Sequence, residues 1–256
     1  TFNVWQKHKN GPMSRHIWAP EIHYLDGKWY VYFAASEEED IWKLRPYVIE
    51  CSGQDPLNDE WIELGQMQPA DFCWAEKTGG QFAASNLYLA EMESPVKLKT
   101  SQFMLTTPDY DWERIDFWVN EGPAVIKNEG KIYITFSASA TGACYCMGIM
   151  EADKNADLLD RNSWQKSRYP VLETDYEKKI FGPGHNSFTV DENGKPLSIY
   201  HARDYEKAVG DPSVVPESDK RPLEEIIADP LYDPNRHARM MEVKFDNNGR
   251  PIFKYY

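Results

Sequence analysis

Apolar and polar residues alternate over short stretches along most of the chain. Three of these stretches share one layout: a strand, a turn that ends in Gly-Lys, and a second strand rich in β-branched and aromatic residues. They begin at Trp18, Glu121 and His185, and in each the turn glycine follows nine residues later. The repeat predicts three β-hairpins and gives Trp18, Glu121 and His185 one equivalent position, just before the first strand.

Two further strand-like stretches follow each hairpin, so each unit has four strands. After the first hairpin they cover residues 47–52 and 61–65, after the second 144–151 and 165–172, and after the third 238–245 and 251–255. Four strands in about 50 residues is the period of a β-propeller blade. An incomplete unit has strands at 72–77, 86–92 and 103–106 but lacks a first strand with its Gly-Lys turn, and residues 2–8 form a lone short strand.

The pattern predicts an all-β fold, namely a five-bladed β-propeller. We expect one catalytic domain over residues 1–256, with an incomplete first blade and a third blade that lacks its first strand. A Pro-rich insertion at about 204–236 interrupts the last unit, with a short helix at 223–228. A β-sandwich with irregular hairpins is the alternative fold.

Composition narrows the class of protein. The chain has 256 residues, nine Trp, fifteen Tyr and a formal charge of −13, which argues for an ordered core and against a nucleic-acid partner. No apolar run reaches the ~20 residues of a membrane span, so no membrane partner is expected. The four cysteines show no metal-finger spacing and are expected to be buried free thiols.

Glu121 is the candidate general acid. It lies among apolar and aromatic residues directly before an apolar strand, and such a setting favours the protonated carboxyl because burial disfavours charge. A capping or solvated carboxylate is the other interpretation of this stretch taken alone.

The repeat suggests where a ligand would bind. The first strands of propeller blades line the central channel, so Trp18, Glu121 and His185 would meet at one mouth of it, ringed by Trp74 and Trp118. Aromatic walls with carboxylates are typical of a sugar site.

Two further residues have open roles. Arg203 ends the strand after His185 and would hold a sugar hydroxyl or a carboxylate, or else be a surface arginine. His185 would be a metal or water ligand on the axis, or else a core histidine.

Four motifs give the chain a family resemblance: Trp-Ala-Pro-Glu at 18–21, Asn-Glu-Gly-Pro at 120–123, Gly-Pro-Gly-His-Asn-Ser at 182–187 and Tyr-His-Ala-Arg at 200–203. Together they resemble the signatures of glycoside hydrolase family 43, and are most similar to its exo-acting α-L-arabinofuranosidase branch. The resemblance covers nearly the whole chain and implies a five-bladed propeller and an inverting hydrolase.

The resemblance also implies site residues. Glu121 matches the family's general acid, His185 its histidine that holds an axial ion, often calcium, through water, and Arg203 its substrate-contacting arginine. No residue matches the general base Asp or the second, pKa-tuning Asp. We expect the base ahead of Thr1 and the second Asp on a strand missing near Asp71, which is itself not assigned.

The resulting hypothesis is an inverting glycosidase that releases terminal α-L-arabinofuranose from plant cell-wall polysaccharide side chains or oligosaccharides. It would need no cofactor for its chemistry, although an axial structural ion such as calcium is implied near His185. The alternatives are a β-xylosidase or endo-arabinanase of the same family, or a carbohydrate-binding propeller without catalysis. Secretion or periplasmic export is expected for such an enzyme.

Overall fold

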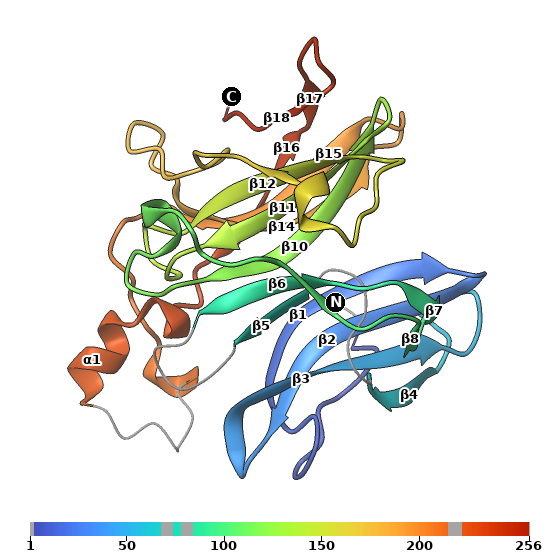
Figure 1. Ribbon diagram of the computed structural model, residues 1–256. Coiled ribbons are helices and arrows are strands. Elements are labelled where there is room, and N and C mark those ends of the chain that lie inside the picture. The colour runs from blue at the N-terminus through green and yellow to red at the C-terminus, as the bar shows by residue number, and fades with distance from the viewer. Residues whose placement is uncertain (1–2, 68–73, 78–83, 215–221, 256) are drawn as a thin grey trace. The chain divides into compact units, whose positions relative to one another are not determined.

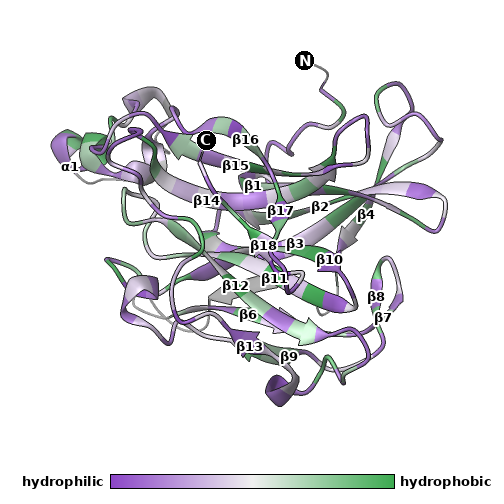
Figure 2. Ribbon diagram, turned by 90° about the horizontal axis from the view of Figure 1, so that it is seen from above, coloured by the Kyte–Doolittle hydropathy of each residue, from purple (hydrophilic) through white to green (hydrophobic). Residues whose placement is uncertain are grey.

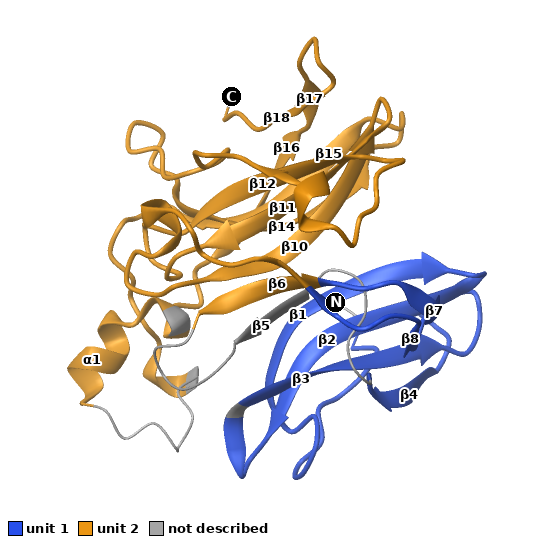
Figure 3. Ribbon diagram, in the orientation of Figure 1, with its two compact units in different colours: residues 1–72, 89–103 blue, residues 73–88, 104–256 orange. Residues whose placement is uncertain are grey.

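The computed structural model describes residues 3–67, 74–77, 84–214 and 222–255. The chain divides into two compact units, residues 1–72 with 89–103 (unit 1) and residues 73–88 with 104–256 (unit 2), which Figure 3 colours separately. Each unit is built mainly from antiparallel strands, so the predicted all-β class is confirmed. The expectation of a single domain stays a prediction.

Unit 1 contains a four-stranded antiparallel sheet in the order β1-β2-β3-β4 (Figure 1). Its strands are β1 (Arg15–Leu25), β2 (Lys28–Glu37), β3 (Asp40–Cys51) and β4 (Trp61–Gln66), and a small hairpin of β7 (Met92–Ser94) and β8 (Lys97–Leu98) is also present. The first four-strand unit predicted from the repeat is therefore confirmed.

The hairpin turns follow from their residues. Asp26 and Gly27 have φ angles of 49° and 82°, and Glu129 and Gly130 have 44° and 82°. A two-residue turn with both φ angles positive matches the right-handed twist of the strands on either side, and glycine adopts such angles without a steric penalty. The Gly-Lys signal therefore locates the turns of β1–β2 and β10–β11.

The predicted strand at residues 2–8 is wrong: residues 3–8 form none, and Phe2 is outside the described residues. Side-chain contacts hold this segment instead. The Trp5 ring lies 5.1 Å from the Phe33 ring, and its Nε1 donates to Glu63 Oε1 at 2.7 Å. A segment that is fixed by its aromatic side chain does not need a backbone ladder.

Unit 2 contains a second four-stranded sheet, in the order β10-β11-β12-β13, which confirms the second predicted unit, although only Gln165–Lys166 of its fourth predicted strand (165–172) form one. A three-stranded sheet of β14, β15 and β16 and a two-stranded sheet of β17 and β18 follow, and most of a further sheet, β5-β6-β9, also falls in this unit. The strands are β5 (Trp74–Lys77), β6 (Ser85–Leu89), β9 (Phe103–Thr106), β10 (Asn120–Asn128), β11 (Lys131–Ala138), β12 (Cys146–Asp153), β13 (Gln165–Lys166), β14 (Phe181–Val190), β15 (Pro196–Arg203), β16 (His237–Glu242), β17 (Lys244–Phe245) and β18 (Pro251–Ile252).

One predicted strand is divided in two. Residues 238–245 were expected to be continuous, but β16 ends at Glu242 and β17 pairs with β18. The Val243 amide donates to the Pro196 carbonyl at 2.9 Å. Because β15 begins at Pro196, the chain after Val243 has no further partner on that strand.

The core of unit 2 lies between its sheets and includes Tyr133, Met147, Ile149, Tyr200 and Ala202. β11 is buried along almost its whole length. Figure 2 shows apolar and polar residues alternating along several strands, as expected of sheets with one packed face.

Within the insertion, the predicted helix is confirmed as α1 (Leu223–Ala228). Cys51, Cys144 and Cys146 are free, with Cys51 and Cys146 buried and Cys144 half-buried. The missing strand and second Asp expected near Asp71, like Cys73, fall outside the described residues. No helix in the described part of the chain has the length and apolar character of a membrane span.

Candidate active site

Glu121 lies at the start of β10, where the strand is irregular. The pairing of β10 with β11 shifts register between Glu121 and Ala124, and Gly122 has a φ of 55°. Such a bulge redirects a side chain away from the regular pleat. The Glu121 carboxylate is half-buried, and its Oε1 accepts a hydrogen bond from the Tyr145 hydroxyl at 2.7 Å.

His185 lies next to this carboxylate. It sits in β14 within the register shift between Gly184 and Ser187, with a φ of 49°, and its amide donates to Ser137 Oγ at 2.6 Å. The Tyr145 hydroxyl is 3.4 Å from His185 Nδ1. The structure therefore brings two of the three equivalent repeat positions together, with Tyr145 between them.

Tyr145 was not singled out from the sequence. Its side chain is fully buried, just before β12, where the sequence looked like ordinary strand core. Burial, together with the negative charge of Glu121, raises the pKa of Tyr145 well above its usual range. The phenol therefore stays protonated and can donate.

His201 stacks on this group. Its ring lies 5.4 Å from the Tyr145 ring at an interplanar angle of 10°, and 6.4 Å from the His185 ring at 27°. Burial, reinforced by the nearby Arg236 charge, lowers the pKa of His201 to about 3. The imidazole is therefore neutral near pH 7.

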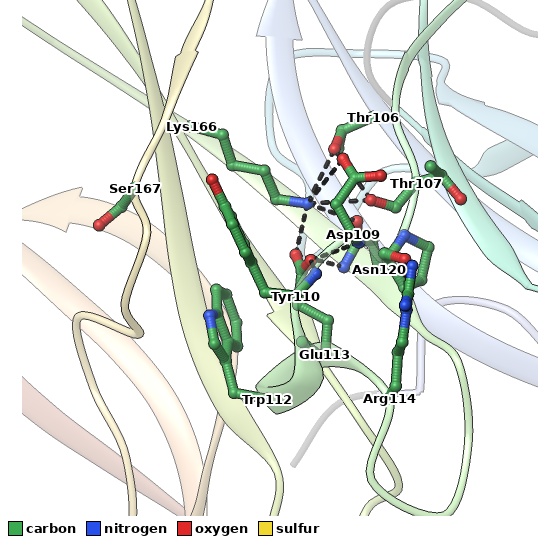
Figure 4. Close-up of polar contacts among 12 residues, drawn as sticks. Thr106, Thr107, Asp109, Tyr110, Trp112, Glu113, Arg114, Asn120, Lys166 and Ser167 are labelled. Atoms are coloured by element: carbon green, nitrogen blue, oxygen red, sulfur yellow. Dashed lines mark hydrogen bonds and ion pairs between the residues drawn. The ribbon is translucent and has the colours of Figure 1, made fainter.

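A buried polar network holds the residue before Glu121, as Figure 4 shows. Glu113 is fully buried and accepts hydrogen bonds from the Asp109 and Tyr110 amides at 2.7 and 2.8 Å. Its Oε1 also accepts from Asn120 Nδ2 at 3.0 Å and pairs with Lys166 Nζ at 2.5 Å. No repeat or motif in the sequence pointed to this network.

Arg203 is inside the protein, with 1% of its surface exposed, so the surface-arginine interpretation is wrong. Its Nε donates to Asp233 Oδ2 at 2.9 Å, Nη1 to the Thr141 carbonyl at 2.7 Å and Nη2 to the Pro230 carbonyl at 2.8 Å. These contacts tie the insertion to the end of β15. The contact with substrate that the resemblance implies stays a prediction.

The three candidate tryptophans lie in separate segments of the chain. Trp118 is 52% exposed, with the Arg114 guanidinium 4.6 Å from its ring centroid. Trp18 belongs to unit 1, where it stacks on His16 at 4.7 Å. Trp74 lies in β5, and its side chain falls outside the described part. Their roles in binding substrate stay predictions.

The residues around His185 suit an ion reached through water. His185 Nε2 is buried and has no hydrogen-bond partner among the described residues. Within those residues, no group of three or more His, Cys, Asp and Glu side chains could enclose a metal. Calcium prefers oxygen ligands, so an intervening water is the contact that this nitrogen can offer.

An open pocket of about 480 Å³ lies elsewhere in unit 2. Its lining includes the carboxylates Asp116, Glu173 and Glu206, with Trp112 and Tyr176. Glu121 and His185 are not part of this lining, so the pocket and the candidate site are different features.

Comparison with known proteins agrees with the motifs. The family model described as glycosyl hydrolases family 43 matches residues 1–251. An extracellular exo-alpha-(1->5)-L-arabinofuranosidase from Streptomyces avermitilis is 39% identical over 98% of this chain, and one of the same name from Streptomyces chartreusis is 43% identical over 82%. The chain spans 52% of the first relative and 69% of the second.

Among solved structures, an alpha-L-arabinofuranosidase from Lactobacillus brevis is 42% identical, with a TM-score of 0.82. The match covers 99% of this chain and 81% of that one. With a family match over nearly its whole length and relatives this similar, the chain belongs to glycosyl hydrolase family 43.

Proposed function

We propose that this protein is an inverting, exo-acting α-L-arabinofuranosidase that removes terminal arabinofuranose from plant cell-wall polysaccharide side chains or oligosaccharides. The names of the similar enzymes support the sugar and the exo mode. The observation that carries the chemistry is Glu121, a half-buried carboxyl held 2.7 Å from a buried phenol.

In this mechanism Glu121 protonates the oxygen of the leaving group as the glycosidic bond breaks. A carboxylate on the opposite face of the sugar activates water, at a separation of about 6.5–9.5 Å between the two carboxyl groups. We assign no described residue to this base, which the family resemblance identifies as an aspartate.

We also propose the five-bladed propeller as the architecture. The four-stranded sheets of β1–β4 and β10–β13 support two blades, and the three-stranded sheets of β14–β16 and of β5, β6 and β9 support two more. The relationship between the sheets of the two units is part of the proposal.

A hydrated cation, calcium for example, is proposed beside His185. The buried Nε2, which has no partner in the part of the chain that the structure describes, supports it, since this nitrogen would accept a hydrogen bond from water in the ion's shell. When bound, the ion would supply positive potential at the site. The extracellular names of two relatives support secretion.

The test is a screen of aryl α-L-arabinofuranosides and aryl β-D-xylosides, with the first-formed anomer of the product followed by NMR. We expect hydrolysis of the arabinofuranosides with inversion, and release of single arabinose units from arabino-oligosaccharides. Preference for xylosides, internal cleavage of arabinan, or saccharide binding without hydrolysis would each replace the proposal with one of the alternatives.

A further inference from the structure

The Tyr145 hydroxyl has one proton, and its polar neighbours include Glu121, His185 and Ser137. Glu121 Oε1 at 2.7 Å is within the range of a short, charge-assisted hydrogen bond, whereas His185 Nδ1 at 3.4 Å is a longer contact. The phenol proton points to Glu121 Oε1, which accepts it both in the carboxylate and in a carboxyl that carries its proton on Oε2. Toward His185 the phenol oxygen can then act only as an acceptor.

This assignment fixes the form of the His185 ring. If Nδ1 faces an acceptor, Nδ1 carries the proton and a neutral ring has its free lone pair on Nε2. That nitrogen is buried and has no partner among the described residues. His185 Nε2 is therefore a hydrogen-bond acceptor within the site.

We propose that Tyr145 is a positioning residue that fixes the carboxyl of Glu121 for proton transfer and sets the Nδ1–H tautomer of His185. The inference rests on the proposed function only for the role of Glu121 as the acid. The tautomer follows from the hydrogen-bond geometry alone.

The glycines of the two motifs allow the backbone to pack closely against Tyr145 and His185. A Cβ on Gly184 would lie 2.4 Å from Tyr145 Cε1, and one on Gly122 would lie 3.1 Å from the His185 ring. A Cβ on Gly182 would be 2.3 Å from the Gly142 carbonyl oxygen and 3.6 Å from Tyr145 Cβ. At Gly184 the backbone thus approaches Tyr145 too closely for a side chain to fit without a shift, whereas at Gly122 the His185 ring would need to move only slightly.

A core tyrosine without such a role has a different hydrogen-bond partner. Tyr133 provides the comparison. Tyr133 is also fully buried, but its hydroxyl donates to a backbone carbonyl, that of Gly249, at 3.0 Å. The Tyr145 hydroxyl instead donates to Glu121, the proposed general acid. Burial raises the pKa of Tyr145, so its hydroxyl stays protonated at neutral pH.

The test compares Tyr145→Phe with Tyr133→Phe in the full-length protein. Each variant removes one buried hydroxyl and keeps the ring. With aryl arabinofuranosides whose leaving groups are poor, we expect Tyr145→Phe to lower kcat about 10- to 100-fold, because these substrates depend on proton donation. With good leaving groups kcat should stay within about threefold, since little protonation is needed. Tyr133→Phe should show no such dependence.

If the two variants show the same dependence on the leaving group, the positioning role is overturned. If wild-type enzyme and Glu121→Gln are equally active on poor leaving groups, the proposed function fails instead. Nitrogen-15 NMR of the histidines in the wild type tests the tautomer independently of both kinetic comparisons. We expect it to show the Nδ1–H form of His185. An Nε2–H form in the wild type would overturn the tautomer assignment.

Discussion

Lys166 and Glu113 form an ion pair inside unit 2, with 2.5 Å between Nζ and Oε1. The lysine side chain is 10% exposed and the glutamate is fully buried. Lys166 also donates to Thr106 Oγ1 and to the Thr107 carbonyl, each at 2.9 Å (Figure 4). Because Glu113 also binds Asn120, this pair supports the segment that leads into the candidate acid.

We expect Lys166→Met to lower the free energy of unfolding by about 3–5 kcal/mol, because the buried Glu113 charge loses the cation that pairs with it. Adding Glu113→Gln should recover part of this loss. Urea unfolding at pH 7 measures both, and the double variant should be clearly non-additive. Lys131→Met, which breaks a more exposed pair with Glu151, is the control and should have a much smaller effect. Equal effects would contradict the role of the buried pair.

Glu121→Gln should reduce kcat on substrates with poor leaving groups by about 10²–10⁴-fold, since the amide cannot donate the proton that the carboxyl supplies. The circular dichroism spectrum and unfolding curve should stay close to those of the wild type. Glu129→Gln, at the exposed turn of the same hairpin, is the matched control. Normal turnover of arabino-oligosaccharides by Glu121→Gln would exclude the assignment.

The parts of the fold that the sequence predicts are those with local causes. The turns at Gly27 and Gly130 need positive φ angles. Glycine adopts such angles readily, so these residues indicate the turns in the sequence. Equal spacing from Gly130 and from Gly194 then aligns Glu121 with His185, and both are found beside Tyr145.

The parts that it does not predict depend on partners distant in the chain. Arg203 becomes an internal residue because Asp233, thirty residues later in a Pro-rich segment, folds back onto it. Tyr145 sits between two cysteines in what resembles ordinary core, so its hydroxyl contact with Glu121 has no local signature. Residues 3–8 alternate like a strand, yet Trp5 fixes them through its side chain.

Gly184→Ala should impair activity by displacing Tyr145. The new Cβ would lie 2.4 Å from Tyr145 Cε1 and 2.8 Å from Ser137 Oγ, so the ring must move. We expect a loss of about 1–3 kcal/mol in stability and a fall in kcat on poor leaving groups.

Gly194→Ala is the control for Gly184→Ala. This position has a φ of 78° and no atom within 4 Å of the added Cβ. It should cost about 1–2 kcal/mol through backbone strain alone and leave kcat unchanged. Unchanged kcat in Gly184→Ala as well would mean that the ring position is not important for turnover.

His201 should make stability sensitive to acid. Its pKa is about 3 in the folded protein, below the usual 6.5, so as the pH falls below about 6.5 the unfolded chain takes up a proton that the folded protein refuses. The contribution of His201 to the free energy of unfolding is complete above about pH 6.5. As the pH falls below this value, the free energy of unfolding declines by about 1.4 kcal/mol per pH unit until the folded protein also binds the proton. His201→Phe keeps a flat ring on Tyr145 and removes the titration. Urea unfolding between pH 7 and pH 4 should give the variant a shallower slope, and parallel slopes would contradict the shifted pKa.

Arg203 and Asp233 allow the anchoring of the insertion to be separated from contact with substrate. Arg203→Lys cannot reach Asp233, Thr141 and Pro230 with one ammonium group, so it should lose about 1.5–3 kcal/mol for each abandoned hydrogen bond. Asp233→Asn removes the charge partner and should also destabilise the protein.

Because the Arg203 guanidinium is 1% exposed and three of its nitrogens are engaged, we expect both variants to change KM for an aryl arabinofuranoside by similar factors. Such a result indicates that Arg203 acts through the loop that it anchors. A rise in KM in Arg203→Lys that Asp233→Asn does not share would instead reveal a direct contact with the sugar, which requires the insertion to open when substrate binds.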